Sequence, residues 1–281
     1  MREGTIFGYA FLVAFILGTG VIKAQEIGLQ IYSLRNEFKN DVPGTFKLIK
    51  DWGITKIEDG NDGTQGYTMS EYQQLLKENN LSMVSISATF DELKNNPETV
   101  VKRANAYGAK YVVCFWVPHK DNVFTIAETR MAVDVFNKAG KLLKKQGVTL
   151  AYHAHGYEFR FYKKGTLFDY MAENAENFAF EMDVYWVKQG GKDPLALLKK
   201  YPKKFVLMHM KDRAIGTPEN LDGKSDVETN VTLGTGDIDI KGLYAEAKNL
   251  GIEYVFIEDE SSRSVTQIPK SLQYLKSLHR K

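Results

Sequence analysis

The chain has 281 residues, of which 43% are hydrophobic and 26% are charged, a composition typical of a soluble globular protein. Its formal net charge of +2 at pH 7 provides no basic field, so we expect no nucleic-acid partner. The single cysteine, Cys114, excludes an intrachain disulfide framework and reads as a buried small hydrophobic residue.

The N-terminus is typical of an export signal. A short basic start is followed by a mostly apolar run over residues 6–22 and by a small residue, Ala24, at a plausible cleavage point. We therefore expect residues 1–24 to be a signal peptide and the mature protein to be periplasmic or secreted, with no membrane attachment. An uncleaved membrane anchor is the alternative, although the apolar run is barely long enough to span a bilayer.

From Glu26 onward, short β-rich runs alternate with helical patterns. Strands are expected at residues 27–32, 55–58, 82–87, 111–116, 148–153, 178–183, 205–209 and 254–258. Helices are expected at about 42–52, 70–79, 97–108, 124–146, 167–174, 194–200, 240–249 and 268–278. Glycines directly follow four of these helices or end them, which favours the predicted helix ends.

This alternation predicts an α/β protein, a single (β/α)₈ TIM barrel over residues 25–281. The parallel strands of such a barrel are buried and therefore read as apolar runs. A doubly wound open sheet is the competing fold, and it would favour a glycine-rich phosphate-binding turn after the first strand. Residues 31–35, Ile-Tyr-Ser-Leu-Arg, are not such a turn.

Polar residues gather where the predicted strands end, and in a barrel the active site lies at these carboxyl ends. In chain order they are Tyr32, Glu58, Asp59, Ser87, Trp116, His119, His153, His155, Asp183, His209 and Glu258. A charged group at the end of a buried strand is costly to desolvate unless it has a partner or a metal. Their convergence on one face favours a functional site over isolated structural roles.

Four of these residues, His153, Asp183, His209 and Glu258, are candidate ligands of a mononuclear metal site. Imidazole and carboxylate ligands together suit Mn²⁺, Zn²⁺, Co²⁺ or Fe²⁺ better than Ca²⁺ or Mg²⁺. Glu258 is also a candidate base.

Several further residues are candidates for catalysis or substrate binding. His155 could contact the substrate or support a ligand, and Glu58 and Glu158 are spare carboxylates that could orient a ligand or act as a base. Lys211 could polarise a carbonyl group, and Arg213 could bind an anionic group. An aromatic rim suitable for stacking on sugar faces is formed by Tyr32, Trp116 and Trp186. The loop Gly-Thr-Gly-Asp at 234–237 could cradle an anion or simply bend the chain.

The segments AYHAHGYEF, EMDVYWV, HMKD, GTGDID and FIEDE, with the opening GLQIYSLR, resemble those of xylose-isomerase-like barrels known as sugar phosphate isomerases/epimerases. The resemblance covers essentially the whole mature chain. It implies a divalent metal held by Glu, Asp, His and Glu from the last four strands. Asp183, His209 and Glu258 match the last three positions, whereas His153 stands where many relatives have Glu. The usual pair of proton-transferring glutamates is then incomplete, and Glu158 is a candidate substitute.

The same superfamily contains AP endonucleases with a histidine-rich trinuclear zinc site. Their pattern implies histidines where this chain has Trp186 and Asn230. Together with the near-neutral charge and the export signal, this departure disfavours DNA repair.

The first functional hypothesis is a metal-dependent isomerase or epimerase. It would remove a proton next to the carbonyl group of a sugar through an enediolate, with a small carbohydrate as its partner. The same enolate could expel a β-substituent, so a lyase acting on 3-keto glycosides is the runner-up. A non-catalytic sugar-binding barrel is the third hypothesis. The export signal favours a free or 3-keto sugar over a phosphorylated one. Which sugar, which metal and which oligomeric state apply is left open.

Overall fold

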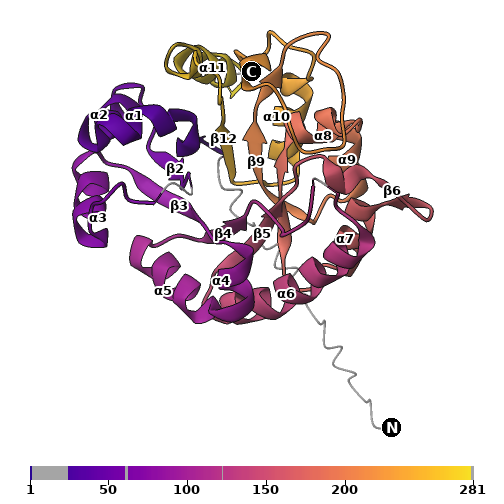
Figure 1. Cartoon of the computed structure of the whole chain (residues 1–281). Coiled ribbons are helices and arrows are strands. Elements are labelled where there is room, and N and C mark those ends of the chain that lie inside the picture. Colours follow the sequence, from indigo (N-terminus) through magenta and orange to yellow (C-terminus); the bar gives the residue numbers. More distant parts are fainter. Residues whose placement is uncertain (2–24, 61–62, 122, 280–281) are drawn as a thin grey trace.

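Eight parallel strands close into a barrel in the computed structural model of the chain, and helices surround them (Figure 1). The structure describes residue 1 and residues 25–60, 63–121 and 123–279. The predicted signal peptide, apart from Met1, lies outside these residues. No helix in the described ranges combines the length and apolar character that a membrane crossing needs.

The strands lie close to their predicted positions, and the predicted TIM barrel is confirmed. They are β1 (Glu26–Gln30), β2 (Lys56–Glu58), β3 (Ser82–Ser87), β4 (Tyr111–Cys114), β5 (Thr149–His153), β8 (Ala179–Asp183), β9 (Phe205–Met210) and β12 (Tyr254–Ile257). Around the barrel the order is β1-β12-β9-β8-β5-β4-β3-β2, so the last strand pairs with the first.

The predicted helices correspond to eight elements of the structure. They are α2 (Val42–Asp51), α3 (Met69–Glu78), α5 (Pro97–Tyr107), α6 (Ile126–Lys145), α7 (Leu167–Asn174), α9 (Pro194–Lys200), α10 (Ile240–Asn249) and α11 (Ser264–His279). Gly108 illustrates why they end where they do: it closes α5 with a φ of 66°, in the left-handed region that favours glycine.

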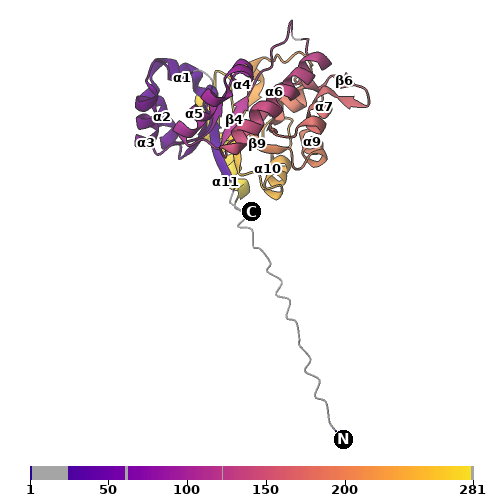
Figure 2. The same ribbon diagram turned by 90° about the horizontal axis from the view of Figure 1, so that it is seen from below.

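Several short elements escape the sequence pattern. Among them are the six-residue helices α1 (Arg35–Asn40), α4 (Phe90–Asn95) and α8 (Val184–Gln189). Two small hairpins join β6 (Phe161–Tyr162) to β7 (Gly165–Thr166) and β10 (Asp212–Arg213) to β11 (Asn230–Val231). The first hairpin projects from the body of the barrel, as Figure 1 and Figure 2 both show. Such segments are too short for a hydrophobic period to develop.

Two apolar clusters fix the barrel. The larger one fills the space between the strands and the surrounding helices. The smaller one lies inside the barrel and consists of Val84, Val113, Ala151, Leu207, Tyr254 and Phe256. Gly28 on β1 leaves room for it, because a Cβ atom there would lie 2.6 Å from the ring of Phe256. The packed interior supports the polar groups at the carboxyl ends of the strands.

Candidate active site

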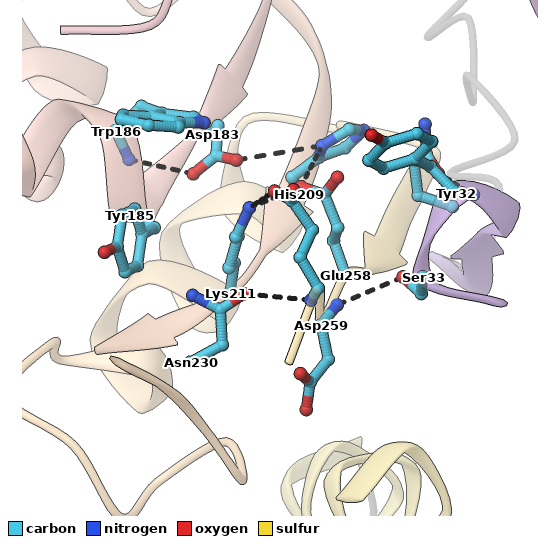
Figure 3. Close-up of polar contacts among 12 residues, drawn as sticks. Tyr32, Ser33, Asp183, Tyr185, Trp186, His209, Lys211, Asn230, Glu258 and Asp259 are labelled. Atoms are coloured by element: carbon cyan, nitrogen blue, oxygen red, sulfur yellow. Dashed lines mark hydrogen bonds and ion pairs between the residues drawn. The ribbon is translucent and has the colours of Figure 1, made fainter. Parts of the chain in front are cut away.

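Four neighbouring strands bring the predicted metal ligands into one cluster. Asp183 ends β8 and pairs in register with His209 on β9. Nδ1 of His209 lies 3.9 Å from Oδ2 of Asp183 and 3.1 Å from Oε2 of Glu258. Nε2 of His153, at the end of β5, lies 3.8 Å from the same Asp183 oxygen. Figure 3 shows Asp183, His209 and Glu258 pointing toward one another.

The two carboxylate oxygens of Asp183 have different surroundings. Oδ1 accepts a hydrogen bond of 2.9 Å from the backbone N–H of Trp186 and so caps the start of α8. Oδ2 is buried and has no hydrogen-bond partner. Burial raises the pKa of Asp183 to about 7, although the charge of Lys211 opposes the shift. A buried carboxylate oxygen that faces two imidazoles without a hydrogen bond can serve as a ligand of a divalent cation.

The donor set has the chemistry that such a cation requires. Ligand atoms from His153, Asp183 and His209 lie within 4.8 Å of one another, and all three residues are buried. Two nitrogen donors with carboxylate oxygens match the preference of Mn²⁺, Zn²⁺ or Co²⁺. These residues therefore fit a divalent metal, with Glu258 as a fourth donor.

Carboxylates surround His209 on several sides. Burial alone would lower the pKa of His209, but the charges of Glu181, Glu258 and Glu58 outweigh it and hold the pKa well above its usual value. For His153 burial dominates and lowers the pKa well below its usual value. Negative charge is thus in excess around His209, and a bound cation would neutralise it.

A buried lysine connects the strand ends to two carboxylates. Nζ of Lys211 lies 3.3 Å from Oε2 of Glu258 and also donates to Oε1 of Glu260. Burial would raise the pKa of Glu258, but the charges of Lys211 and His209 outweigh it and hold that pKa well below its usual value. These charges therefore keep Glu258 ionised.

A cavity of about 330 Å³ adjoins the cluster, a volume suited to a small molecule. It is lined by Gln30, Tyr32, Gly60, Phe115, Trp116, His153, His155, Trp186, Glu258 and Glu260. The predicted aromatic rim of Tyr32, Trp116 and Trp186 thus reaches the cavity. Trp116 is 52% exposed at the opening, whereas Trp186 is buried.

His155 lies on the same cavity wall. Its ring centroid is 4.7 Å from that of His153 and 5.3 Å from that of Trp186. Nδ1 of His155 is buried and has no hydrogen-bond partner. Burial lowers the pKa of His155 to about 4, so the neutral imidazole can hydrogen-bond a hydroxyl group in the cavity.

Glu158 is not among the residues that line the cavity, and its role as a base stays a prediction. Residues Tyr157–Phe159 form a short 3₁₀ turn in which Glu158 is fully buried. Its oxygens accept hydrogen bonds from the Tyr152 hydroxyl and from the backbone N–H of His155. The Tyr152 ring packs on Phe136 of α6, on the outer face of the barrel.

Two other predicted substrate contacts also lie away from the cavity lining. Arg213 is 2% exposed and is engaged by Asp237, at 2.8 Å, and by Gln189, at 3.0 Å. Its charge is neutralised within the fold. Glu58 is fully buried, with Oε1 2.6 Å from Nε2 of His209. It contacts a candidate ligand and is not among the residues that line the cavity.

The glycine loop at 234–237 does hold an anionic group, but that group is a side chain of the protein. The backbone N–H groups of Gly234 and Gly236 both donate to Oδ2 of Asp212, each at 2.9 Å. A further N–H, from Ile238, donates to Oδ1 of Asp212. The loop is therefore a structural bend secured by a carboxylate.

Three residues of the site are not singled out by the sequence. Glu181 lies within the apolar run of β8, two residues before Asp183, and alternation along the strand puts both on one face. Glu260 follows Glu258 with the same spacing, so the FIEDE segment carries that signal. Phe115 directly follows β4, within the apolar run predicted as a strand, and carries no signal.

The burial of Glu158 can be tested through the pH dependence of the free energy of unfolding. Burial raises the pKa of Glu158 to about 7 from 4.5, so its contribution to stability is complete below about pH 4.5 and is lost as the pH rises through about 7. Glu158→Gln should therefore gain stability relative to the wild type as the pH rises, by up to about 3 kcal/mol. Urea unfolding at pH 4.5 and pH 8 measures this difference, and a pH-independent difference would contradict the placement.

The fold and the site define a TIM barrel with imidazoles and carboxylates gathered at the carboxyl ends of its strands. Residues 46–278 match the family model of the xylose isomerase-like TIM barrel, and the chain belongs to this family. A comparison with curated proteins gave no match.

Solved structures share the fold over nearly the full length. A sugar phosphate isomerase/epimerase from Parabacteroides distasonis ATCC 8503 has a TM-score of 0.75 and 23% identity, covering 92% of this chain and 96% of that one. A second such protein from the same organism has a TM-score of 0.70 and 25% identity, covering 89% and 97%. The IOLI protein, solved with a zinc atom, has a TM-score of 0.69 and 15% identity, covering 90% and 96%.

Proposed function

We propose that this protein is a divalent-metal-dependent isomerase or epimerase that removes a proton next to the carbonyl group of an unphosphorylated sugar. The observation that carries the proposal is Oδ2 of Asp183, buried without a hydrogen bond between the imidazoles of His153 and His209. A divalent metal bound there supplies Lewis-acid polarisation of the carbonyl and the adjacent hydroxyl group. The names of the two Parabacteroides neighbours agree with this reaction class.

The protein's own groups would move the proton. Glu258 lines the cavity as an ionised carboxylate and would accept the proton from the carbon next to the carbonyl group. Glu260 also lines the cavity and shares Lys211 with Glu258, so it is the second carboxylate in place of Glu158. Return of the proton to the neighbouring carbon gives isomerisation, and return to the other face of the same carbon gives epimerisation.

The charge of the cavity favours an unphosphorylated substrate. Among the described residues that line it, two are glutamates and none is a lysine or arginine. The nearby Lys211 is engaged by both glutamates, and Arg213 is paired with Asp237. A phosphate group would therefore meet negative charge without a cationic partner. Aromatic walls and hydroxyl-binding groups suit a neutral sugar instead.

Proton–deuterium exchange across a panel of sugars tests the proposal. With Mn²⁺ or Co²⁺ added, the protein should exchange the C–H proton next to the carbonyl of free ketoses or 3-keto glycosides in D₂O. Their phosphorylated counterparts should exchange at least tenfold more slowly at equal concentration. A protein that binds sugar but exchanges no proton would contradict the proposal and favour a non-catalytic sugar-binding barrel.

A lyase acting on 3-keto glycosides is the second candidate, favoured by the exposed indole of Trp116 at the cavity opening. The indole of Trp116 packs against the ring of His119, with ring centroids 5.4 Å apart. His119 is in turn held by a hydrogen bond of 2.7 Å from its Nδ1 to the Val117 carbonyl. Such a platform suits a second ring outside the cavity. Release of the aglycone from a 3-keto glycoside, alongside proton exchange, would identify elimination as the reaction.

We also propose that residues 1–24 direct export, which would keep the protein away from intracellular sugar phosphates. The basic start, apolar run and small residue at position 24 support the proposal. N-terminal sequencing of protein isolated from its native host should find Gln25 first, and an intact Met1 would contradict cleavage.

A further inference from the structure

Two buried glutamates lie behind the candidate metal ligands. Glu181 comes from β8 and Glu58 from β2, and their exposed fractions are 1% and 0%. Neither lines the cavity, so neither meets the substrate. Two carboxylates inside the barrel are costly to desolvate, so their position requires a physical explanation.

Both glutamates contact imidazole nitrogens of the candidate ligands. Oε2 of Glu181 lies 3.0 Å from Nδ1 of His153, and Oε1 of Glu58 lies 2.6 Å from Nε2 of His209. Oε2 of Glu181 also lies 3.2 Å from Nε2 of His209. In each imidazole the other nitrogen is the one that faces Asp183.

We propose that Glu181 and Glu58 are positioning residues that fix the tautomers of His153 and His209. Each glutamate accepts the N–H of its histidine. This leaves a lone pair on Nε2 of His153, which faces Asp183, and one on Nδ1 of His209, which faces Asp183 at 3.9 Å and Glu258 at 3.1 Å. This inference rests on the metal-dependent function proposed above.

The same geometry argues against a second metal ion among Glu58, Glu181 and His209. Two donors of one tetrahedral ion, each about 2.1 Å from it, are roughly 3.4 Å apart. Oε1 of Glu58 and Nε2 of His209 are 2.6 Å apart, which is a hydrogen-bond distance. The pairs around Asp183, at 3.8 and 3.9 Å, leave room for an ion. Nδ1 of His209 and Oε2 of Glu258, at 3.1 Å, would have to separate slightly for Glu258 to join as a fourth donor.

The test measures metal affinity in the full-length protein by chelator competition with Zn²⁺ and Co²⁺. Glu181→Gln and Glu58→Gln should each weaken binding by about 10- to 100-fold and alter the visible absorption of bound Co²⁺. Glu158→Gln is the matched control, because Glu158 is an equally buried glutamate outside the cluster, and it should leave metal affinity unchanged. Glu181→Asp, which keeps the charge, should recover part of the loss.

A double-mutant cycle separates positioning from a general structural role. If Glu181 acts through His153, adding Glu181→Gln to His153→Gln should weaken metal binding by less than about threefold further. Unchanged affinity in both single variants would overturn this inference and leave the proposed function standing. Two metal ions per chain, with one lost in Glu58→Gln, would also overturn it by making the glutamates ligands. A wild-type protein without metal affinity would overturn both proposals.

Discussion

Asp183→Asn is expected to abolish metal binding and to reduce proton exchange by at least about 10³-fold, because several kcal/mol of charge stabilisation are lost with the metal. The change is selective. Asparagine retains the side-chain oxygen that accepts from the N–H of Trp186, so the cap of α8 is kept. Only the oxygen facing His153 and His209 is replaced by an amide group, which cannot bind a cation in the same way.

Asp193→Asn provides the control for this variant. Asp193 caps α9 in the same manner, with Oδ1 accepting from the N–H groups of Leu195 and Ala196, and it lies outside the candidate site. Its replacement should leave metal content and exchange rate within about twofold of the wild type. Metal content is measured by elemental analysis of purified protein. An Asp183→Asn protein with full metal content would contradict the assignment of Asp183 as a ligand.

Lys211→Met is expected to lower the free energy of unfolding by about 3–5 kcal/mol, because it leaves two carboxylates near the barrel mouth without their cation. Lys211 is 1% exposed and pairs with Glu258 and Glu260. The rings of Tyr185 and Trp186 also lie beside its ammonium group, with centroids at 5.3 and 5.7 Å. The pKa of Glu258 should rise as well, since the charge of Lys211 helps to lower it.

Urea unfolding measures this loss of unfolding free energy, and two further variants show whether it comes from the buried charges. Adding Glu260→Gln to Lys211→Met removes one uncompensated charge and should restore part of the stability. Lys200→Met breaks an exposed pair with Asp169, in which the lysine is 54% exposed, and should cost less than about 1 kcal/mol. A loss below about 1 kcal/mol in Lys211→Met would contradict a stabilising role for the buried lysine.

The barrel could be predicted from the sequence because its strands are buried on both faces and its helices are long enough to show a period. The cluster of His153, Asp183, His209 and Glu258 could be predicted because each residue follows or ends an apolar run, and parallel strands place such ends on one face. The sequence carried no comparable signal for Phe115, whose run reads as an ordinary strand.

The sequence could not predict the contacts of side chains that depend on loops or on layers inside the barrel. Glu158 is close to His153 in the chain, but it lies in a 3₁₀ turn and accepts a hydrogen bond from Tyr152. Glu58 ends a strand as predicted, yet it lies below the mouth against His209. Arg213 follows the seventh barrel strand, but a small hairpin and Asp237 hold it. Such contacts join distant parts of the chain, and a strand pattern does not encode them.

Proton exchange measured before and after metal removal tests the central claim most directly, namely that Asp183 and its two histidines hold a metal required for proton abstraction. The protein should contain one divalent metal per chain and should incorporate deuterium next to the carbonyl of an unphosphorylated keto sugar in D₂O. Chelation should stop the incorporation, and added Mn²⁺ or Co²⁺ should restore it. Incorporation that continues at the same rate in metal-free protein would contradict the claim.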